Sequence, residues 1–513
     1  MASWLQIILD EHPKDLTQLC VVTGCLNYLQ PKQDSFLIPD TLRIVLKSCQ
    51  QPSNHAYQSF QAFKLWSLKA KQRQESKFLK ENPQDLQEVL DVINANWENP
   101  IRGVPDLMGD SLTFILDLVN SPELDKILWE QMAALSWKTK AKYPLMLVLL
   151  PRIGVSRVLE TEPNFASNLV ESLSSNHLTS AGTSVYRCIV RTPKVYELWK
   201  VHVMPHLIHA LCHDERPLVR SNCKHHWLNP TLEALPMQAA DVMYAQLCSL
   251  NSDQSEMAKC LVIKCIRLKS SEQEVLSEEY LLTLQRCLIH SEDEVRSAAF
   301  AALCHTKKKS NVPSVSEMKM IKEFIELNLA VDSAAFRQVF ISDFTKWMVR
   351  LRDCSVTLYR KKVENNFWTL VEFVDEILNC LFSNLFPGAN YQRLITSLEL
   401  LRVLHHCFFN YKPCVGINKA SKADSSDPSG LVGHVLQVRH LMDFYQQAHM
   451  EKLLSATLHY MIDVKSLASE ILAFFRPNQT AIRAVLKKAL LLACSCKFSE
   501  CETAALLFSL CLR

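Results

Sequence analysis

Histidine and cysteine residues give this chain its first candidate for chemistry, a metal site. Four histidines occur at positions i, i+4, i+7 and i+11 of a predicted helix and would share one face: His202, His206, His209 and His213. Further candidate ligands follow nearby: Cys212, Cys223, His225 and His226. Zinc needs three or four such ligands in a tetrahedron. The H-E-x-x-H and C-x-x-C spacings are missing, however, and Pro205 interrupts the predicted helix. We therefore predict a partly exposed, pH-sensitive helix face and no metal ion.

The sequence lacks the motifs of nucleophilic catalysis and of nucleotide cofactors. It has neither a G-x-S-x-G elbow nor a local Cys–His protease signature. Only 9 of the 513 residues are glycine, and none has a G-x-G-x-x-G or G-x-x-x-x-G-K-[ST] spacing. Turns that bring the backbone close to a phosphate need glycine, so an ATP, dinucleotide or S-adenosylmethionine enzyme is not expected. We predict a protein that is not an enzyme and carries no cofactor.

Three clusters of basic residues indicate a different chemistry, contact with nucleic acid. The first cluster is predicted to lie on one helix face near Trp66 and Phe78 and consists of Lys69, Arg73, Lys77 and Lys80. The second lies between Trp137 and Tyr143 and consists of Lys138, Lys140 and Lys142. The third consists of Arg350, Arg352, Arg360, Lys361 and Lys362. Such clusters can follow a phosphate backbone while an aromatic ring stacks on an unpaired base. A plain solvated helix face is the alternative for each of them.

Pairs of helices are predicted to position these clusters, and the clearest pair spans residues 277–305. Its first helix presents Leu281, Leu284 and Leu288 on one face, and its second helix has an apolar stripe that begins at Val295. Ser291 and Glu294 have the S-x-x-E spacing of a capping box. The second helix opens with D-x-V-R, which is typical of HEAT repeats, where the acidic residue and the arginine commonly pair between neighbouring units. Weaker matches to this helix opening occur at residues 218–220, 336–337 and 463–465.

The whole chain is therefore predicted to be all-α, a HEAT/armadillo-like α-solenoid of roughly a dozen degenerate helix pairs. We expect helical repeats over residues 1–411 and 434–513, separated by a mobile loop at 412–433 that is rich in Ser, Asp, Lys, Pro and Gly. The 19 cysteines are scattered singly, which favours reduced thiols in the core of a cytosolic protein. No signal peptide or membrane-spanning run is visible in the sequence.

Several segments resemble the thyroid adenoma-associated protein (THADA) family, which includes fungal proteins that assist tRNA ribose methylation. The matching segments are W-E-N-P at Trp97–Pro100, L-S-W-K-T-K-A-K-Y at Leu135–Tyr143, I-G-V at Ile153–Val155, L-I-H-S-E-D-E-V-R at Leu288–Arg296 and L-F-P-G-A-N-Y-Q-R at Leu385–Arg393. They follow the family's order over roughly residues 85–475. Family members are considerably longer, so we expect this chain to be a partial or short form.

The resemblance implies a non-catalytic scaffold or regulatory subunit. It would position tRNA for 2′-O-ribose methylation at anticodon-loop position 32 by an FtsJ-type methyltransferase. The implied partners are that enzyme, which would carry the S-adenosylmethionine site, and the tRNA anticodon arm. The gain in rate would then come from positioning. A HEAT-repeat adaptor in transport or signalling, with protein ligands and no RNA role, is the alternative.

Overall fold

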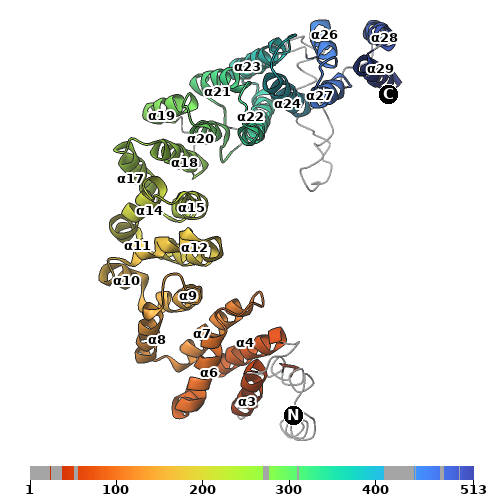
Figure 1. Ribbon diagram of the computed structural model, residues 1–513. Helices are drawn as coiled ribbons and strands as arrows, with labels where there is room; N and C mark the ends of the chain where they lie inside the picture. Colours follow the sequence, from red (N-terminus) through yellow and green to blue (C-terminus); the bar gives the residue numbers. More distant parts are fainter. Residues whose placement is uncertain are drawn as a thin grey trace. The chain divides into compact units, whose positions relative to one another are not determined.

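Every regular element in the described part of the computed structural model is a helix (Figure 1). The structure describes residues 23–24, 37–50, 56–74, 76–269, 276–308, 311–408, 444, 446–473, 479–495 and 497–512. The loop expected at 412–433 lies outside these residues. The chain separates into two compact units, Met1–Ala239 and Ala240–Arg513.

Helices of the first unit pack in two rows. Its elements are α3 (Leu37–Gln50), α4 (Ala56–Arg73), α5 (Ser76–Glu81), α6 (Pro83–Ala95), α7 (Val104–Val119), α8 (Pro122–Ala134), α9 (Lys142–Ile153), α10 (Val155–Thr161), α11 (Phe165–Leu169), η1 (Val170–Ser174), α12 (Asn176–Arg191), α13 (Tyr196–Leu198), η2 (Trp199–Val203), α14 (Met204–Cys212), α15 (Pro217–Asn222), η3 (Cys223–Leu228) and α16 (Asn229–Ala234). One row runs α4, α7, α9, α12 and α16, each in contact with the next, while α3, α6, α8 and α10 pack against its members.

Two ion pairs of equal spacing join α4 to α7. Lys64 pairs with Asp110, and Lys71 donates to Asp117 at 2.6 Å. Both pairs join residues 46 apart in the sequence. The two helices therefore lie parallel and in register, at a separation within the 40 to 47 residues of a HEAT repeat.

Two prolines in the first unit lie two residues after the end of a π-helical turn. Pro205 stands just after η2, and Pro230 just after η3. Proline has no N–H to donate to the preceding turn, and a local shift to i→i+5 hydrogen bonds accommodates it while the helical path continues. The interruption predicted at Pro205 is thus a change of helical pitch.

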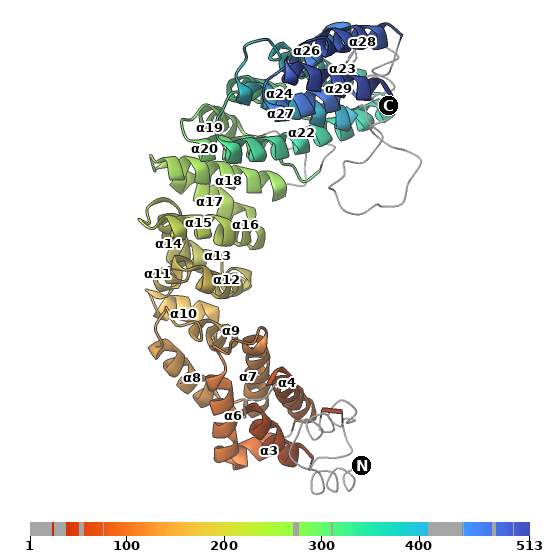
Figure 2. The same cartoon turned by 45° about the vertical axis from the view of Figure 1, so that its right-hand side comes forward.

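The second unit repeats the two-row packing (Figure 2). Its elements are α18 (Asp253–Lys269), α19 (Glu278–Leu288), α20 (Asp293–Cys304), α21 (Val315–Asn328), α22 (Ala334–Lys361), α23 (Glu364–Ser383), α24 (Tyr391–Phe408), α26 (Gln447–Ala456), α27 (Ile462–Leu472), α28 (Gln479–Ala493) and α29 (Phe498–Leu512), with α17 (Met237–Cys248) at its start. One row runs α18, α20, α22, α24 and α27, and the other runs α19, α21 and α23. The predicted all-α, HEAT-like class is confirmed in both units.

The turn before α20 differs from the prediction. Glu292, not Ser291, is the N-cap of α20, so the capping box expected from Ser291 and Glu294 does not form. Instead, Arg296 donates to the carbonyls of His290 and Ser291 at 2.6 and 2.8 Å and pairs with Asp293 in its own helix. Arg296 of the D-x-V-R motif therefore stabilises the turn that precedes its own helix. The prediction that it pairs with a neighbouring repeat is wrong.

Stacked rings fill the core where α20, α21 and α22 meet. The Phe300 and Phe324 rings stack with centroids 4.2 Å apart, and Phe340 meets both edge-on at 5.3 Å. Each such pair adds about 0.5–1.5 kcal/mol beyond the burial of its area. Buried cysteines complete the interior, and none of the following forms a disulfide with another described residue: Cys212, Cys223, Cys260, Cys287 and Cys304. None of the described helices is long and apolar enough to cross a membrane.

Candidate nucleic-acid interface

The first basic cluster does not lie on one continuous helix. Helix α4 ends at Arg73, Gln74 takes a left-handed conformation with φ 55°, and α5 begins at Ser76. Lys69 is half-buried and Lys80 is exposed. The side chains of Arg73, Lys77 and Phe78 lie outside the described residues. The stripe expected on a single helix face is therefore wrong, because a left-handed residue redirects the chain between its members.

The aromatic neighbour expected to stack on a base in this cluster belongs to the core. Trp66 is 0% exposed. Helix α4 buries this indole together with Phe60, Phe63 and Ala70, at the spacing of one helix face. A base cannot reach it without unpacking the helix.

Lys142 of the second cluster is a buried helix cap, so its prediction as an RNA contact is wrong. Its side chain is 1% exposed. The ammonium donates to the carbonyls of Met132, Ala133 and Leu135 at 3.0, 3.0 and 2.7 Å. These carbonyls end α8, where a helix leaves acceptors unpaired and where the macrodipole favours a cation. Burial lowers the pKa of Lys142, and the nearby Glu162 carboxylate opposes that shift.

The remaining members of the second cluster lie at the surface. Lys138 and Lys140 are exposed on the turn between α8 and α9. The Trp137 ring beside them is half-buried and meets the Phe165 ring edge-on, with centroids 5.7 Å apart. Tyr143 fixes the turn by donating its hydroxyl to the Trp137 carbonyl at 2.5 Å. This turn therefore presents two cations next to a partly accessible indole.

The first member of the third cluster, Arg350, is also buried. Arg350 is 2% exposed and donates to the carbonyls of Asn311 at 2.9 Å and Leu303 at 3.3 Å. Its guanidinium lies 3.7 Å from the Glu317 carboxylate and over the Trp347 ring. The prediction of Arg350 as an RNA contact is wrong, because α22 turns this residue toward α20 and α21.

The other members of the third cluster divide into a paired and an exposed part. Arg352 makes two hydrogen bonds to Asp353, at 3.0 and 2.8 Å. Arg360 and Lys361 are exposed at the C-terminal end of α22, followed by Lys362 in a left-handed conformation. Ten helical residues separate Arg350 from Arg360, or about 15 Å at 1.5 Å per residue. The third cluster is thus no single patch.

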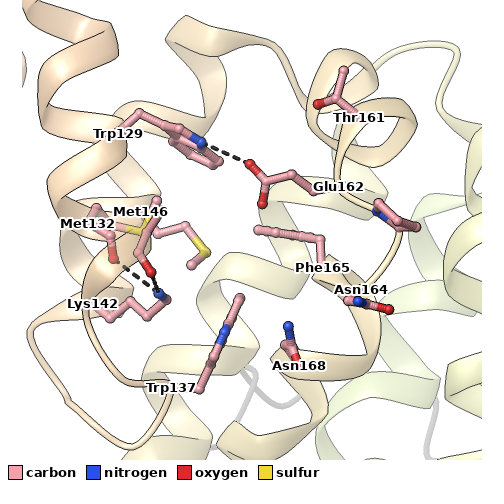
Figure 3. Close-up of a pocket in the computed structure, with 12 residues that line it drawn as sticks. Trp129, Met132, Trp137, Lys142, Met146, Thr161, Glu162, Asn164, Phe165 and Asn168 are labelled. Carbon is pink, nitrogen blue, oxygen red and sulfur yellow. Dashed lines mark hydrogen bonds between the residues drawn. The ribbon is translucent and has the colours of Figure 1, made fainter.

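A pocket of about 360 Å³ opens beside the second cluster (Figure 3). Helix α8 and the following turn supply one side of it, and the segment from α10 to α11 supplies the other. Its walls contain three aromatic rings and two methionines: Trp129, Trp137, Phe165, Met132 and Met146. Its volume lies at the lower end of the range of ligand pockets, and its lining mixes these apolar side chains with polar ones.

Three polar side chains of the pocket have capacity for a ligand. Glu162 accepts a hydrogen bond from the Trp129 indole through one carboxylate oxygen, at 2.9 Å. In Figure 3 its second oxygen is directed toward the open space. Asn164 and Asn168 also line the pocket, and within the described part of the chain their side-chain amides make no hydrogen bonds.

A second hollow of about 450 Å³ adjoins the pocket along α8 and shares Trp129, Thr161 and Glu162 with it. Its other lining is mostly charged, and two of its cations pair with its acids. Arg152 pairs with Asp125 at 2.9 Å, and Lys126 lies 3.9 Å from Glu130. The hollow is therefore close to neutral, and the aromatic pocket is the more distinctive surface.

Sequence reasoning missed Glu162, Asn164, Phe165 and Asn168. The available signal was the T-E-P-N-F turn at residues 161–165, where proline and asparagine end one helix and begin the next. Among the described residues, no group of three or more His, Cys, Asp or Glu side chains is arranged to hold a metal ion. The His209 and His213 rings lie with centroids 6.0 Å apart.

Comparison with known proteins gives one family model and several curated relatives. The model described as "Trm732, TPR repeats" matches residues 196–420. The human protein named tRNA (32-2'-O)-methyltransferase regulator THADA is 23% identical over 485 residues, which cover 82% of this chain and 24% of the relative. The mouse protein of the same name is 23% identical over 483 residues, with 83% and 24% covered. The resemblance to the THADA family is confirmed, and the chain spans about a quarter of these relatives' length.

Solved structures that match this chain have lower sequence identity than these relatives. UNC-45 from Drosophila melanogaster has a TM-score of 0.42 and 11% identity, with 99% of this chain and 77% of that chain covered. The Pds5–Scc1 complex gives a TM-score of 0.37 and 13% identity, with 100% and 83% covered.

Proposed function

We propose that this chain is a non-catalytic, regulatory part of a tRNA ribose-methylation machinery in the cytosol. It holds the anticodon arm of tRNA so that an FtsJ-type methyltransferase modifies the 2′-hydroxyl at position 32. The observation that carries the proposal is the similarity to proteins named tRNA (32-2'-O)-methyltransferase regulators, which extends along 82% of the chain. The enzyme brings the methyl donor, and this chain contributes orientation.

Exposed cations support an RNA-holding role for the chain. Lys138 and Lys140 follow the half-buried Trp137 indole in the first unit, and Arg360 and Lys361 end α22 in the second. Lysine and arginine at such positions bind phosphates, and an aromatic ring beside them can stack on a base. RNA binding by short exposed clusters releases counterions, so it weakens as salt rises.

Methylation in cells tests the proposal most directly. The 2′-O-methyl level at tRNA position 32 is measured in cells that lack the gene, with and without return of this 513-residue chain. We expect the methyl group to disappear without the gene and to return with the chain. An unchanged methyl level would favour the alternative, a protein-only adaptor, and would overturn the proposal.

Binding of purified protein to tRNA tests the exposed cations. The double substitution Lys138→Ala and Lys140→Ala removes two phosphate contacts, so it should weaken binding several-fold. It should also reduce the slope of log affinity against log salt by about 1 to 2. The matched control is Lys319→Ala with Lys497→Ala, whose side chains belong to the second unit and are 75% and 76% exposed. Equal losses in both double variants would show that the turn has no specific role.

A further inference from the structure

The pocket between α8 and α11 has the shape and lining of a site for one flat ring. Indoles of Trp129 and Trp137 stand at its two ends, and the Phe165 ring lies between them on the far wall (Figure 3). Aromatic walls stack on any planar ligand with a π-face. Its volume of about 360 Å³ leaves room for a single heterocycle with its sugar at the opening.

The polar groups in the pocket select for a ligand that donates hydrogen bonds. An ionised Glu162 accepts only, and one of its oxygens already accepts from Trp129. The amides of Asn164 and Asn168 can both donate and accept. Adenine, cytosine and guanine offer an exocyclic amino group next to a ring nitrogen, whereas uracil offers a single N–H between two carbonyls.

A cationic protein side chain fits this pocket less well than a neutral base. The Lys142 ammonium already lies 4.6 Å from the Trp137 ring centroid, where a cation–π ligand would sit. Its three carbonyl partners hold it there. A second cation would be repelled by this charge, while a neutral ring would not. Lys138 and Lys140, exposed on the same turn, lie where flanking phosphates of an RNA strand could meet them.

We propose that this pocket binds one unstacked, amino-bearing nucleobase of an RNA, with Glu162 accepting from the exocyclic amine and Trp137 and Phe165 forming the apolar walls. The inference rests on the proposed function, because it assumes that the chain holds RNA. It adds a base-reading site to contacts that otherwise involve only phosphates.

Base preference of the full chain is the test. Affinities for short single-stranded oligo(A), oligo(C) and oligo(U) are measured at one salt concentration, for the wild type and for Glu162→Gln. We expect the wild type to bind oligo(A) and oligo(C) more tightly than oligo(U). In the variant this ratio of affinities should fall about ten-fold, because the amide of Gln can donate to uracil carbonyls. Glu372→Gln is the matched control because Glu372 is exposed on α23 in the second unit, and it should keep the preference.

A second variant keeps the inference testable if Glu162→Gln weakens the contact to Trp129 and unfolds the region. Asn168→Leu keeps the number and branching of the side-chain heavy atoms but removes the amide, so it should lower affinity for amino-bearing oligomers while the melting temperature changes little. Ultraviolet cross-linking of tRNA to the wild-type chain should place a nucleotide on Trp137 or Phe165.

The outcomes separate the two proposals. If tRNA binds, but both pocket variants keep the wild-type preference and cross-links fall elsewhere, the base pocket is refuted while the proposed function stands. If the wild-type chain binds no tRNA at any salt concentration, the proposed function fails and the pocket inference fails with it.

Discussion

The α8–α9 turn of the first unit and the α20–α22 contact of the second both bury a basic residue beside a tryptophan. Lys142 lies over Trp137, and Arg350 over Trp347. The two cations are compensated differently. Lys142 has three neutral carbonyls at the end of α8. Arg350 has two carbonyls and also the buried carboxylate of Glu317.

The difference shows that a basic cluster near a tryptophan has two distinct uses in this fold. The buried member of each cluster donates to carbonyls at the end of a helix or pairs with a buried carboxylate. The exposed members are accessible to a binding partner. Burial lowers the pKa of Arg350 to about 10, with Glu317 opposing that shift. Because Glu317 carries a formal charge, the α20–α22 contact should tolerate loss of its cation less well than the α8–α9 turn.

Removal of the Arg350 charge should have the largest effect on stability. Arg350→Met leaves the Glu317 carboxylate, 8% exposed in its side chain, with Arg267 as its one cationic partner among the described residues. The variant also leaves the carbonyls of Leu303 and Asn311 without the guanidinium donor, and we expect a combined cost of about 3 kcal/mol. Chemical denaturation of the single variants and of the double variant with Glu317→Gln measures it. Strict additivity of the two substitutions would mean that the pair does not couple.

Removal of the Lys142 charge should cost less. Lys142→Met leaves neutral carbonyls of α8 without their donor, which costs about 1–3 kcal/mol. Hydrogen exchange should accelerate in α8 and in the turn, not in the second unit. Lys140→Met is the control, and at this exposed position it should change the free energy of unfolding by less than about 0.5 kcal/mol. A loss as large as that of Arg350→Met would erase the contrast between the two regions.

Lowering the pH should destabilise the α20–α22 contact more than the α8–α9 turn. Burial alone would raise the pKa of Asp343 in α22, but hydrogen bonds from His305 and Lys346, both 2.8 Å, outweigh it and lower the pKa. The stabilisation is present above the ordinary carboxyl pKa near 3.9 and is lost as the pH falls through the lowered value. Its slope reaches at most about 1.4 kcal/mol per pH unit.

Melting temperatures between pH 5 and pH 2 measure this acid effect. Asp343→Asn should flatten the profile in that range, whereas Lys142→Met should leave its shape unchanged, because a lysine is already protonated there. If the melting temperature of Asp343→Asn falls as steeply with pH as that of the wild type, other carboxylates cause the acid sensitivity.

The smallest effect on stability is expected from the exposed members of the clusters. Arg360→Ala with Lys361→Ala, and Lys138→Ala with Lys140→Ala, should each change the free energy of unfolding by less than about 0.5 kcal/mol. Thermal melts of both double variants measure it. A larger loss in either would show that these side chains also serve the fold.

Helical periodicity was enough to predict the fold class and the positions of α20, α22 and α27. It also contained the signal for the two buried cations. Lys142 is in phase with Met146 and Leu149, and all three are buried. Arg350 is in phase with Trp347 and Cys354 in the same way. A charged residue at a helical position that otherwise carries core residues is expected to be buried. Both predictions would have been correct if the helical position of each residue had been considered before its charge.

The aromatic pocket was beyond the reach of sequence patterns. Trp129, Trp137 and Phe165 come from three segments, and each alone is typical of an ordinary core position. Only the packing of α8 against α9, with α10 and α11 beyond, leaves a space between them. A break in the chain such as the one at Gln74 is equally hard to predict, since glutamine has no preference for a left-handed conformation.

The equal offset of the two ion pairs between α4 and α7 limits how this chain can change in length. One residue inserted within α7, between Asp110 and Asp117, would rotate one aspartate by about 100° relative to the other and break a pair. An insertion in the segment between the two helices shifts both aspartates together and keeps both pairs. Gains and losses of residues among relatives should therefore gather in the turns and spare the helices, so that the array can grow by whole repeats while its rows stay aligned.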